Sequence, residues 1–227
     1  MTYVVLFDLD GTLVDSPRAI VETFTAAFES MGTGAKDPAA IRATIGLPLE
    51  QAFAKLLGVP PDDDLVSLGV RRYLALFKEI ILPRAAELLF PGVVAGLEVL
   101  QAQGFTLTIA TSKFHASADA LLSAAGIRDR FAMVVGADQV THPKPHPETG
   151  LMILEKFGVP AGDAVMVGDT THDLLMAKAA GVRAIAVTYG VHSPEELASA
   201  EPARTADTFD DVVKHIEELA QDKEIAR

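Results

Sequence analysis

The stretch VVLFDLDGTL, residues 4–13, decides the fold of this chain. Its first four residues form an apolar run of strand length without alternation, which is typical of a buried central strand of a parallel sheet. Two aspartates, Asp8 and Asp10, follow it directly. Ligands of such sheets gather beyond the carboxyl ends of the strands, and two acids there are costly unless a metal or another cation lies between them. The stretch therefore predicts a parallel sheet with a cation-dependent site at the end of its first strand.

A helical segment interrupts the chain after this strand. Apolar residues recur at helical spacing from Ile20 to Met31, and further helices are expected over 38–44, 49–57 and 64–81. Ser16 and Pro17 suit the N-cap and the first turn of the first helix. Because residues 16–83 carry little strand signal, we expect them to form a small all-α domain inserted into the rest of the chain.

Strands and helices alternate after this insertion. Strands are expected over 105–111, 133–135, 164–167 and 183–187, with helices over 93–103, 117–125, 147–157 and 173–180. This alternation indicates an α/β protein with a doubly wound parallel sheet and helices on both faces. A last helix is expected over 209–220, followed by a frayed, charged tail. The expected domains are a core of residues 1–15 and 84–227 and a helical domain of residues 16–83.

Composition excludes several classes of function. The chain has 31 acidic residues against 19 Lys and Arg, a net charge of −12, so no nucleic-acid partner is expected. It has no cysteine, which excludes disulfides, thiolate metal sites and a cysteine nucleophile. The sequence shows no signal-peptide pattern and no apolar run near the ~18 residues that span a bilayer, so we expect a cytoplasmic protein without a membrane partner.

Polar residues follow the other expected strands at the same edge of the sheet. Thr111 and Ser112 come after the second core strand, and Asp169 and Asp173 come after the fourth. Between them in the sequence lies Lys144, whose flanking prolines restrict the backbone and so set the direction of its side chain. Because the chain is negative overall, a site that handles phosphate needs a local cation of this kind.

In sequence order, these motifs resemble those of the haloacid dehalogenase superfamily, in particular its phosphatase branch with a helical cap inserted after the first motif. The resemblance covers essentially the whole chain and rests on DLDGT at 8–12, on Thr111 and Lys144, and on GDTTHD at 168–173. The stretch TYGVHSPEEL, 188–197, is similar to phosphoglycolate-phosphatase-like members. The resemblance implies a Rossmann-like core, a cap that opens and closes, and Mg²⁺-dependent hydrolysis of a small-molecule phosphate monoester through an aspartyl-phosphate intermediate.

The resemblance also implies roles for the matched acidic residues and the lysine. Asp8 would be the nucleophile and Asp10 the general acid–base. Asp169 would bind Mg²⁺ directly, with Asp173 supporting it or binding through water, and Asp8 and the backbone carbonyl of Asp10 would also belong to the metal site. Lys144 would balance the charge on Asp8 and on the transferred phosphoryl group.

Substrate binding is expected to involve both parts of the chain. Gly11, the Thr111 hydroxyl and the Ser112 backbone N–H would contact the phosphate together with Lys144. In the cap, Gly46 permits a close backbone approach, and Arg42 is the candidate to bind a substrate carboxylate or a second phosphate. Weaker cationic candidates are Arg18, Lys55, Arg71 and Arg72.

Several alternatives stay open at this point. An inorganic pyrophosphatase and a phosphatase of a specialised biosynthetic sugar- or nucleoside-like phosphate both fit the motifs. A β-phosphoglucomutase-like phosphotransferase is disfavoured by Thr12, where that branch commonly has Val, and a phosphonate hydrolase by Asp10. The dehalogenase branch lacks the Asp169–Asp173 pair. Outside the family, a signalling receiver domain is about half this length, and a phosphate-binding module without turnover is disfavoured by the intact acidic residues. Either a monomer or a homodimer is expected.

Overall fold

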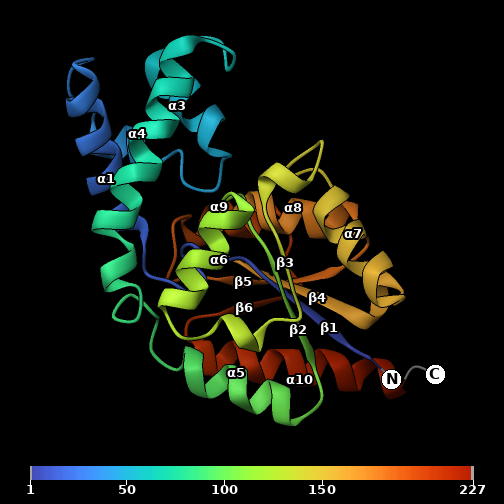
Figure 1. Cartoon of the computed structure of the whole chain (residues 1–227). Coiled ribbons are helices and arrows are strands. Elements are labelled where there is room, and N and C mark those ends of the chain that lie inside the picture. The colour runs from blue at the N-terminus through green and yellow to red at the C-terminus, as the bar shows by residue number, and fades with distance from the viewer. Residues whose placement is uncertain (1, 226–227) are drawn as a thin grey trace.

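The computed structural model describes residues 2–225 and contains a six-stranded sheet (Figure 1). The strands lie in the order β3-β2-β1-β4-β5-β6, and each neighbouring pair is parallel. β1 is central, with Val5 opposite Leu107 of β2 and Val165 of β4. The predicted doubly wound parallel sheet is therefore confirmed. The strands are β1 (Val4–Phe7), β2 (Thr106–Ala110), β3 (Met133–Val135), β4 (Ala164–Gly168), β5 (Arg183–Val187) and β6 (Arg204–Ala206).

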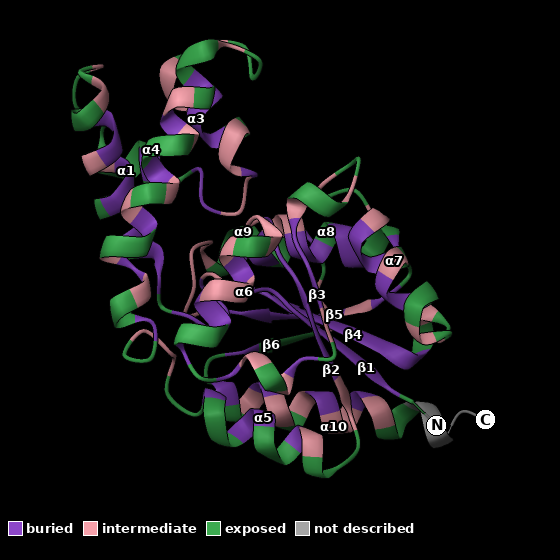
Figure 2. Cartoon of the chain, viewed as in Figure 1, coloured by how far each residue is buried: buried purple, intermediate pink, exposed green. Residues whose placement is uncertain are grey.

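Helices cover both faces of the sheet, and the strands β1 to β5 are mostly buried (Figure 2). Successive residues of a strand point to opposite faces, so the unbroken apolar run of β1 fills two cores. Val5 and Phe7 pack with α5 (Val93–Ala102), α6 (His115–Ala124) and α10 (Phe209–Ile225). Val4 and Leu6 pack with α7 (Glu148–Phe157), α8 (Thr171–Ala179) and α9 (Pro194–Ser199). Within residues 2–225, no helix is both long and apolar enough to cross a membrane.

The remaining helices stand beside the sheet as a group that we call the helical lobe (Figure 1). Four aromatic rings form its centre, Phe24, Phe28, Phe53 and Tyr73, with centroids of contacting pairs 4.8–6.4 Å apart. These rings belong to the same buried cluster as Phe7 of β1, so the lobe shares its apolar interior with the sheet core. The lobe consists of α1 (Pro17–Met31), α2 (Pro38–Arg42), α3 (Leu49–Leu57) and α4 (Asp64–Ile80).

Some local expectations differ from the structure. α6 begins at His115, two residues earlier than expected, because Asp138 from a distant loop accepts a hydrogen bond from the His115 backbone N–H at 2.7 Å. α10 continues to Ile225, so a frayed tail directly after residue 220 is wrong. α9 and β6 were not predicted, because both are short and β6 exposes two of its three residues.

Replacing Gly69 by alanine is expected to destabilise the protein. Alanine is normally better than glycine inside a helix by about 1 kcal/mol. At this position in α4, however, a Cβ would lie 2.5 Å from Cδ1 of the fully buried Phe53. We therefore expect the free energy of unfolding in urea to fall by about 1–3 kcal/mol. Ser67→Ala, at an exposed position of the same helix, is the control and should change it by less than about 0.5 kcal/mol. Unchanged stability of Gly69→Ala would show that the ring has room to move.

Candidate active site

The carboxyl ends of β1, β2 and β4 are neighbours at one edge of the sheet. The chain reaches β2 on one side of β1 and β4 on the other, and such a switch in strand order is where open α/β sheets bind ligands. Asp8 follows β1, Thr111 follows β2 and Asp169 follows β4. The backbone N–H of Asp8 donates to the carbonyl of Val167 at 2.9 Å, which keeps Asp8 beside the end of β4.

Lys144 connects these strand ends. Its Nζ donates to Oδ1 of Asp8 and to the carbonyl oxygen of Ala110, both at 2.9 Å, and to Oδ1 of Asp173. The side chain is only 2% exposed. Burial alone would lower the pKa of Lys144, but the carboxylates of Asp173 and Asp8 raise it above its ordinary value. The ammonium group is therefore charged and fixed between three acceptors.

Two of the acceptors of Lys144, Asp8 and Asp173, form a buried cluster with a third carboxylate, that of Asp169. Ligand oxygens of Asp8, Asp169 and Asp173 lie within 4.8 Å of one another. Burial raises the pKa of Asp8 to about 7; Lys144 opposes this shift, whereas Asp173 and Asp10 add to it. Burial also raises the pKa of Asp169, together with the negative charges of Asp8 and Asp173. One ammonium group does not neutralise three carboxylates, so the cluster lacks positive charge. Hard oxygen ligands in this arrangement fit Mg²⁺.

Neighbouring donors orient two of these carboxylates. Asp169 accepts hydrogen bonds from the Thr12 hydroxyl at 3.0 Å and from the Val191 backbone N–H at 2.8 Å. Oδ2 of Asp173 accepts from the backbone N–H of Thr170 at 3.0 Å and from its hydroxyl at 2.7 Å. Each side chain thus has a defined direction before any ligand is bound.

Asp10 stands apart from the buried cluster and has its own partners. The hydroxyl of Ser16 donates to its Oδ1 at 2.6 Å, and Nζ of Lys113 lies 2.9 Å from its Oδ2. Ser16 was expected to cap α1, but that helix has no side-chain cap bond because the hydroxyl is directed at Asp10 instead. Lys113 has no role in the sequence prediction, although its place directly after Thr111 and Ser112 was the available signal.

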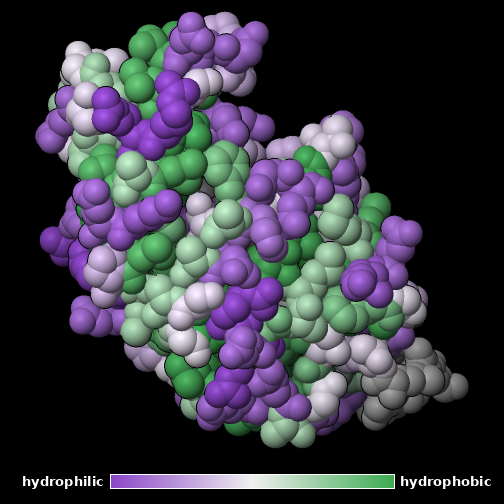
Figure 3. All heavy atoms as spheres, in the orientation of Figure 1, coloured by the Kyte–Doolittle hydropathy of each residue, from purple (hydrophilic) through white to green (hydrophobic). Residues whose placement is uncertain are grey.

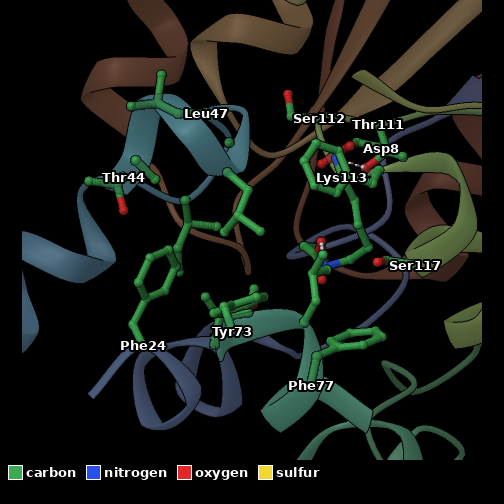
Figure 4. A pocket seen from close by; sticks show the side chains of 18 residues that line it. Asp8, Phe24, Thr44, Leu47, Tyr73, Phe77, Thr111, Ser112, Lys113 and Ser117 are labelled. Atoms are coloured by element: carbon green, nitrogen blue, oxygen red, sulfur yellow. Dashed lines mark hydrogen bonds and ion pairs between the residues drawn. The ribbon is translucent and has the colours of Figure 1, made fainter. Parts of the chain in front are cut away.

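A cavity opens from Asp8 and Asp10 toward the helical lobe (Figure 4). Thr111 and Ser112 line it on the side of the sheet, as predicted for phosphate-binding residues. The buried Ser112 hydroxyl has no hydrogen-bond partner among the described residues, so it is free to bind a ligand. In the space-filling view, the outline is indented between the lobe and the sheet core, and hydrophobic side chains lie on the lobe beside that indentation (Figure 3).

The other predicted substrate contacts lie in three different settings. Gly11 has a φ of +87° and sits against Asp169, where a Cβ would overlap the carboxylate. Gly46 has a φ of +97° and lines the cavity from the lobe, where a Cβ would lie 3.2 Å from Cγ2 of Thr170. Arg42 is exposed, donates to the carbonyl of Gly190 at 3.3 Å, and is not among the residues that line the cavity.

Comparisons with known proteins find relatives of this chain along most of its length. A family model described as haloacid dehalogenase-like hydrolase matches residues 5–187. The probable phosphatase IndB of Dickeya dadantii (strain 3937) is 54% identical over 213 residues, which cover 94% of this chain and 93% of that protein. A phosphoglycolate phosphatase of Rhodospirillum rubrum is 35% identical over 216 residues, covering 92% of this chain and 88% of that protein. The solved structure of a haloacid dehalogenase-like hydrolase from Streptococcus pneumoniae has a TM-score of 0.79 at 29% identity, covering 94% of this chain and 98% of that one.

The stability of the metal-free protein is expected to fall as the pH rises from about 5 to about 8. The pKa of Asp8 is about 7 in the folded state, against 3.8 for an ordinary aspartate. Between these values the folded state binds more protons than the unfolded state, so the free energy of unfolding decreases with pH, by about 2–4 kcal/mol for such a shift.

Chemical unfolding in EDTA across this pH range measures the effect. Asp8→Asn removes the titrating group and is the control, so its stability should fall less steeply with pH. Mg²⁺ should stabilise the wild type more at pH about 8 than at about 5, because the cluster is then more fully ionised. Parallel pH profiles of wild type and Asp8→Asn would contradict the assignment.

Proposed function

The chain belongs to the haloacid dehalogenase-like hydrolases and is a phosphatase of that family, and from this premise we propose that it hydrolyses a small-molecule phosphate monoester in a Mg²⁺-dependent reaction through a phosphate ester on Asp8. One observation carries the proposal. Asp8 lines the cavity with a charged lysine on one of its carboxylate oxygens, which is what a carboxylate nucleophile needs to react with an anionic phosphate.

Asp8 performs the first step by attacking phosphorus. The bond between phosphorus and the ester oxygen breaks as the bond to the Asp8 carboxylate forms. The Lys144 ammonium favours the ionised form of Asp8, against the burial that raises its pKa. Asp10, on the cavity wall, gives its proton to the leaving alcohol oxygen.

The second step reverses the role of Asp10. Its carboxylate takes a proton from the water that attacks phosphorus, the bond between phosphorus and Asp8 breaks, and inorganic phosphate leaves. Ser16 and Lys113 hold one oxygen of Asp10 each, so the carboxyl group keeps its position through both steps. The Thr111 hydroxyl and the Ser112 N–H and hydroxyl are the donors for the phosphate oxygens on the sheet side.

The acidic cluster would hold the metal. Asp8, Asp169 and Asp173, with the backbone carbonyl of Asp10, are the proposed ligands, and the mutual approach of the three carboxylates supports this set. When bound, Mg²⁺ would offset the charge of the clustered carboxylates and of the phosphate.

The helical lobe would act as a cap over the cavity. We propose a core of residues 1–15 and 84–227 and a cap of residues 16–83, as expected from the sequence. In this structure the cap already contacts the core, since Nζ of Lys113 lies 5.1 Å from the centre of the Phe77 ring in α4. Opening of the cap would admit substrate, and its closure would exclude water. The monomer or homodimer and the cytoplasmic location stay predictions.

Asp8→Asn is expected to abolish hydrolysis of p-nitrophenyl phosphate, because the amide cannot form the phosphate ester. Asp10→Asn should lower the steady-state kcat by about 10²–10⁴-fold with the fold retained, since the proton donor and acceptor is lost. Asp15→Asn, at an exposed position of the same loop, is the control and should retain activity. The wild type should lose turnover in EDTA and regain it with Mg²⁺. Undiminished turnover of Asp8→Asn, or of the wild type in EDTA, would contradict the mechanism.

Lys113→Met is expected to lower kcat by about tenfold, because Asp10 loses the partner of its Oδ2. This effect is smaller than the loss of the proton-transferring group itself would cause. Lys113 acts here as a positioning residue, so the pH profile of kcat should shift and Lys113→Arg should recover part of the rate. Lys78→Met, an exposed lysine of α4, is the control. An unchanged pH profile together with an unchanged kcat would show that Ser16 alone holds Asp10.

A further inference from the structure

The cavity beside Asp8 changes from polar to apolar with distance from the strand ends (Figure 4). On the sheet side it is lined by carboxylates and hydroxyls. On the lobe side the wall is made chiefly of apolar side chains from α1, α3 and α4 and the loop before α3, including Phe24, Ile45, Leu49, Tyr73, Leu74 and Phe77. A group attached to a phosphate at Asp8 and extending into the cavity therefore meets hydrocarbon.

The cationic side chains near the cavity are already engaged or lie outside it. Lys113 is the one Lys or Arg among the described residues that line it, and its ammonium lies 2.9 Å from Asp10. Arg42 bonds the Gly190 carbonyl, and Arg18 forms an exposed pair with Glu22 at 3.4 Å. The other candidates for a second anion, Lys55, Arg71 and Arg72, are exposed and do not line the cavity. A carboxylate buried there would have no free counter-charge, which is strongly unfavourable.

The aromatic residues of the lobe wall suit a flat partner. The rings of Phe24 and Tyr73 have centroids 4.8 Å apart, and Figure 4 shows Phe24, Tyr73 and Phe77 along one side of the cavity. The hydroxyl of Tyr73, a residue that lines the cavity, offers one polar contact.

We propose that the substrate is the phosphate monoester of an uncharged alcohol that carries a planar, largely apolar group, and that this group lies against Phe24, Tyr73 and Phe77. The inference rests on the proposed function, because the phosphate at Asp8 fixes the direction in which the leaving group extends. It also separates this chain from an enzyme whose substrate is a phosphorylated carboxylic acid, since the lobe wall has no free cation for the carboxylate.

Matched pairs of esters test the proposal on the wild-type enzyme with Mg²⁺. We compare kcat/KM for benzyl phosphate with that for 4-carboxybenzyl phosphate, and for 2-hydroxyethyl phosphate with that for phosphoglycolate. The members of each pair have leaving alcohols of similar reactivity and differ in one carboxylate. We expect the carboxylate to lower kcat/KM at least tenfold in both pairs, and benzyl phosphate to exceed 2-hydroxyethyl phosphate at least tenfold.

Two pairs of variants test the walls of the cavity. Ser117 of α6 lines the cavity, whereas Ser123 of the same helix is exposed and does not. Ser117→Lys adds a free cation and should raise kcat/KM for 4-carboxybenzyl phosphate at least fivefold, and Ser123→Lys should not. On α4, Leu74 lines the cavity and Leu65 does not. Leu74→Ser should lower kcat/KM for benzyl phosphate more than for 2-hydroxyethyl phosphate, while Leu65→Ser should leave both unchanged.

The outcomes separate the two proposals. Preference for the carboxylate ester in either pair, with good turnover, would overturn the inference and leave the phosphatase assignment standing. Absence of hydrolysis of all four esters and of p-nitrophenyl phosphate would overturn the proposed function itself. Circular dichroism of each variant confirms folding, and the wild-type comparison of esters decides the question even where a variant does not fold.

Discussion

The active site depends on one buried ammonium group. Lys144 bonds Asp8 after β1, the carbonyl of Ala110 at the end of β2 and Asp173 in α8, which follows β4. A parallel sheet gathers the ends of its strands at one edge, but it does not by itself fix the side chains that follow them. The lysine does so, because a buried charge is stable only where every acceptor is close and correctly directed. Its position therefore fixes the carboxylate of Asp8, the group that we propose as the nucleophile.

The single ammonium group of Lys144 does not balance the negative charge of the site. With three buried carboxylates around one ammonium, the cluster has excess negative charge, and the donors at Thr12, Thr170 and Val191 reduce this without cancelling it. Burial and repulsion raise the pKa values of Asp8 and Asp169. A site built only for stability would replace such acids by apolar groups. The unfavourable repulsion between these carboxylates is explained if a divalent cation binds among them and supplies the positive charge that they lack. The same positive charge would then attract an anionic phosphate.

The sequence predicts those parts of the site that follow directly from the ends of strands. Asp8, Thr111 and Asp169 could be placed together because parallel strands present their carboxyl ends on one edge. The bonds from Ser16 and Lys113 to Asp10 were not predicted. A serine before a proline is typical of a helix cap, and the place of Lys113 after Ser112 does not fix the direction of its side chain. In the same way, the start of α6 depends on Asp138, and β6 exists through its pairing with β5 rather than through its own residues. A local sequence pattern does not predict the start of a helix or the presence of a short strand when a residue distant in the sequence supplies the hydrogen bond.

The lobe shows why substrate preference is harder to predict than reaction type. In the sequence, Phe24 and Phe28 are both members of one helical apolar stripe, yet Phe24 lines the cavity and Phe28 does not. The helical spacing of apolar residues predicts only that one face of the helix is turned away from water. Residues in a packed core and residues in a cavity wall show the same spacing. The charged residues follow the opposite logic: Arg42 and Arg71 are easily noticed as candidate anion-binding groups, yet they lie outside the cavity. The type of reaction thus depends on a few polar residues at the ends of strands. Substrate preference depends instead on which apolar side chains of the lobe line the cavity.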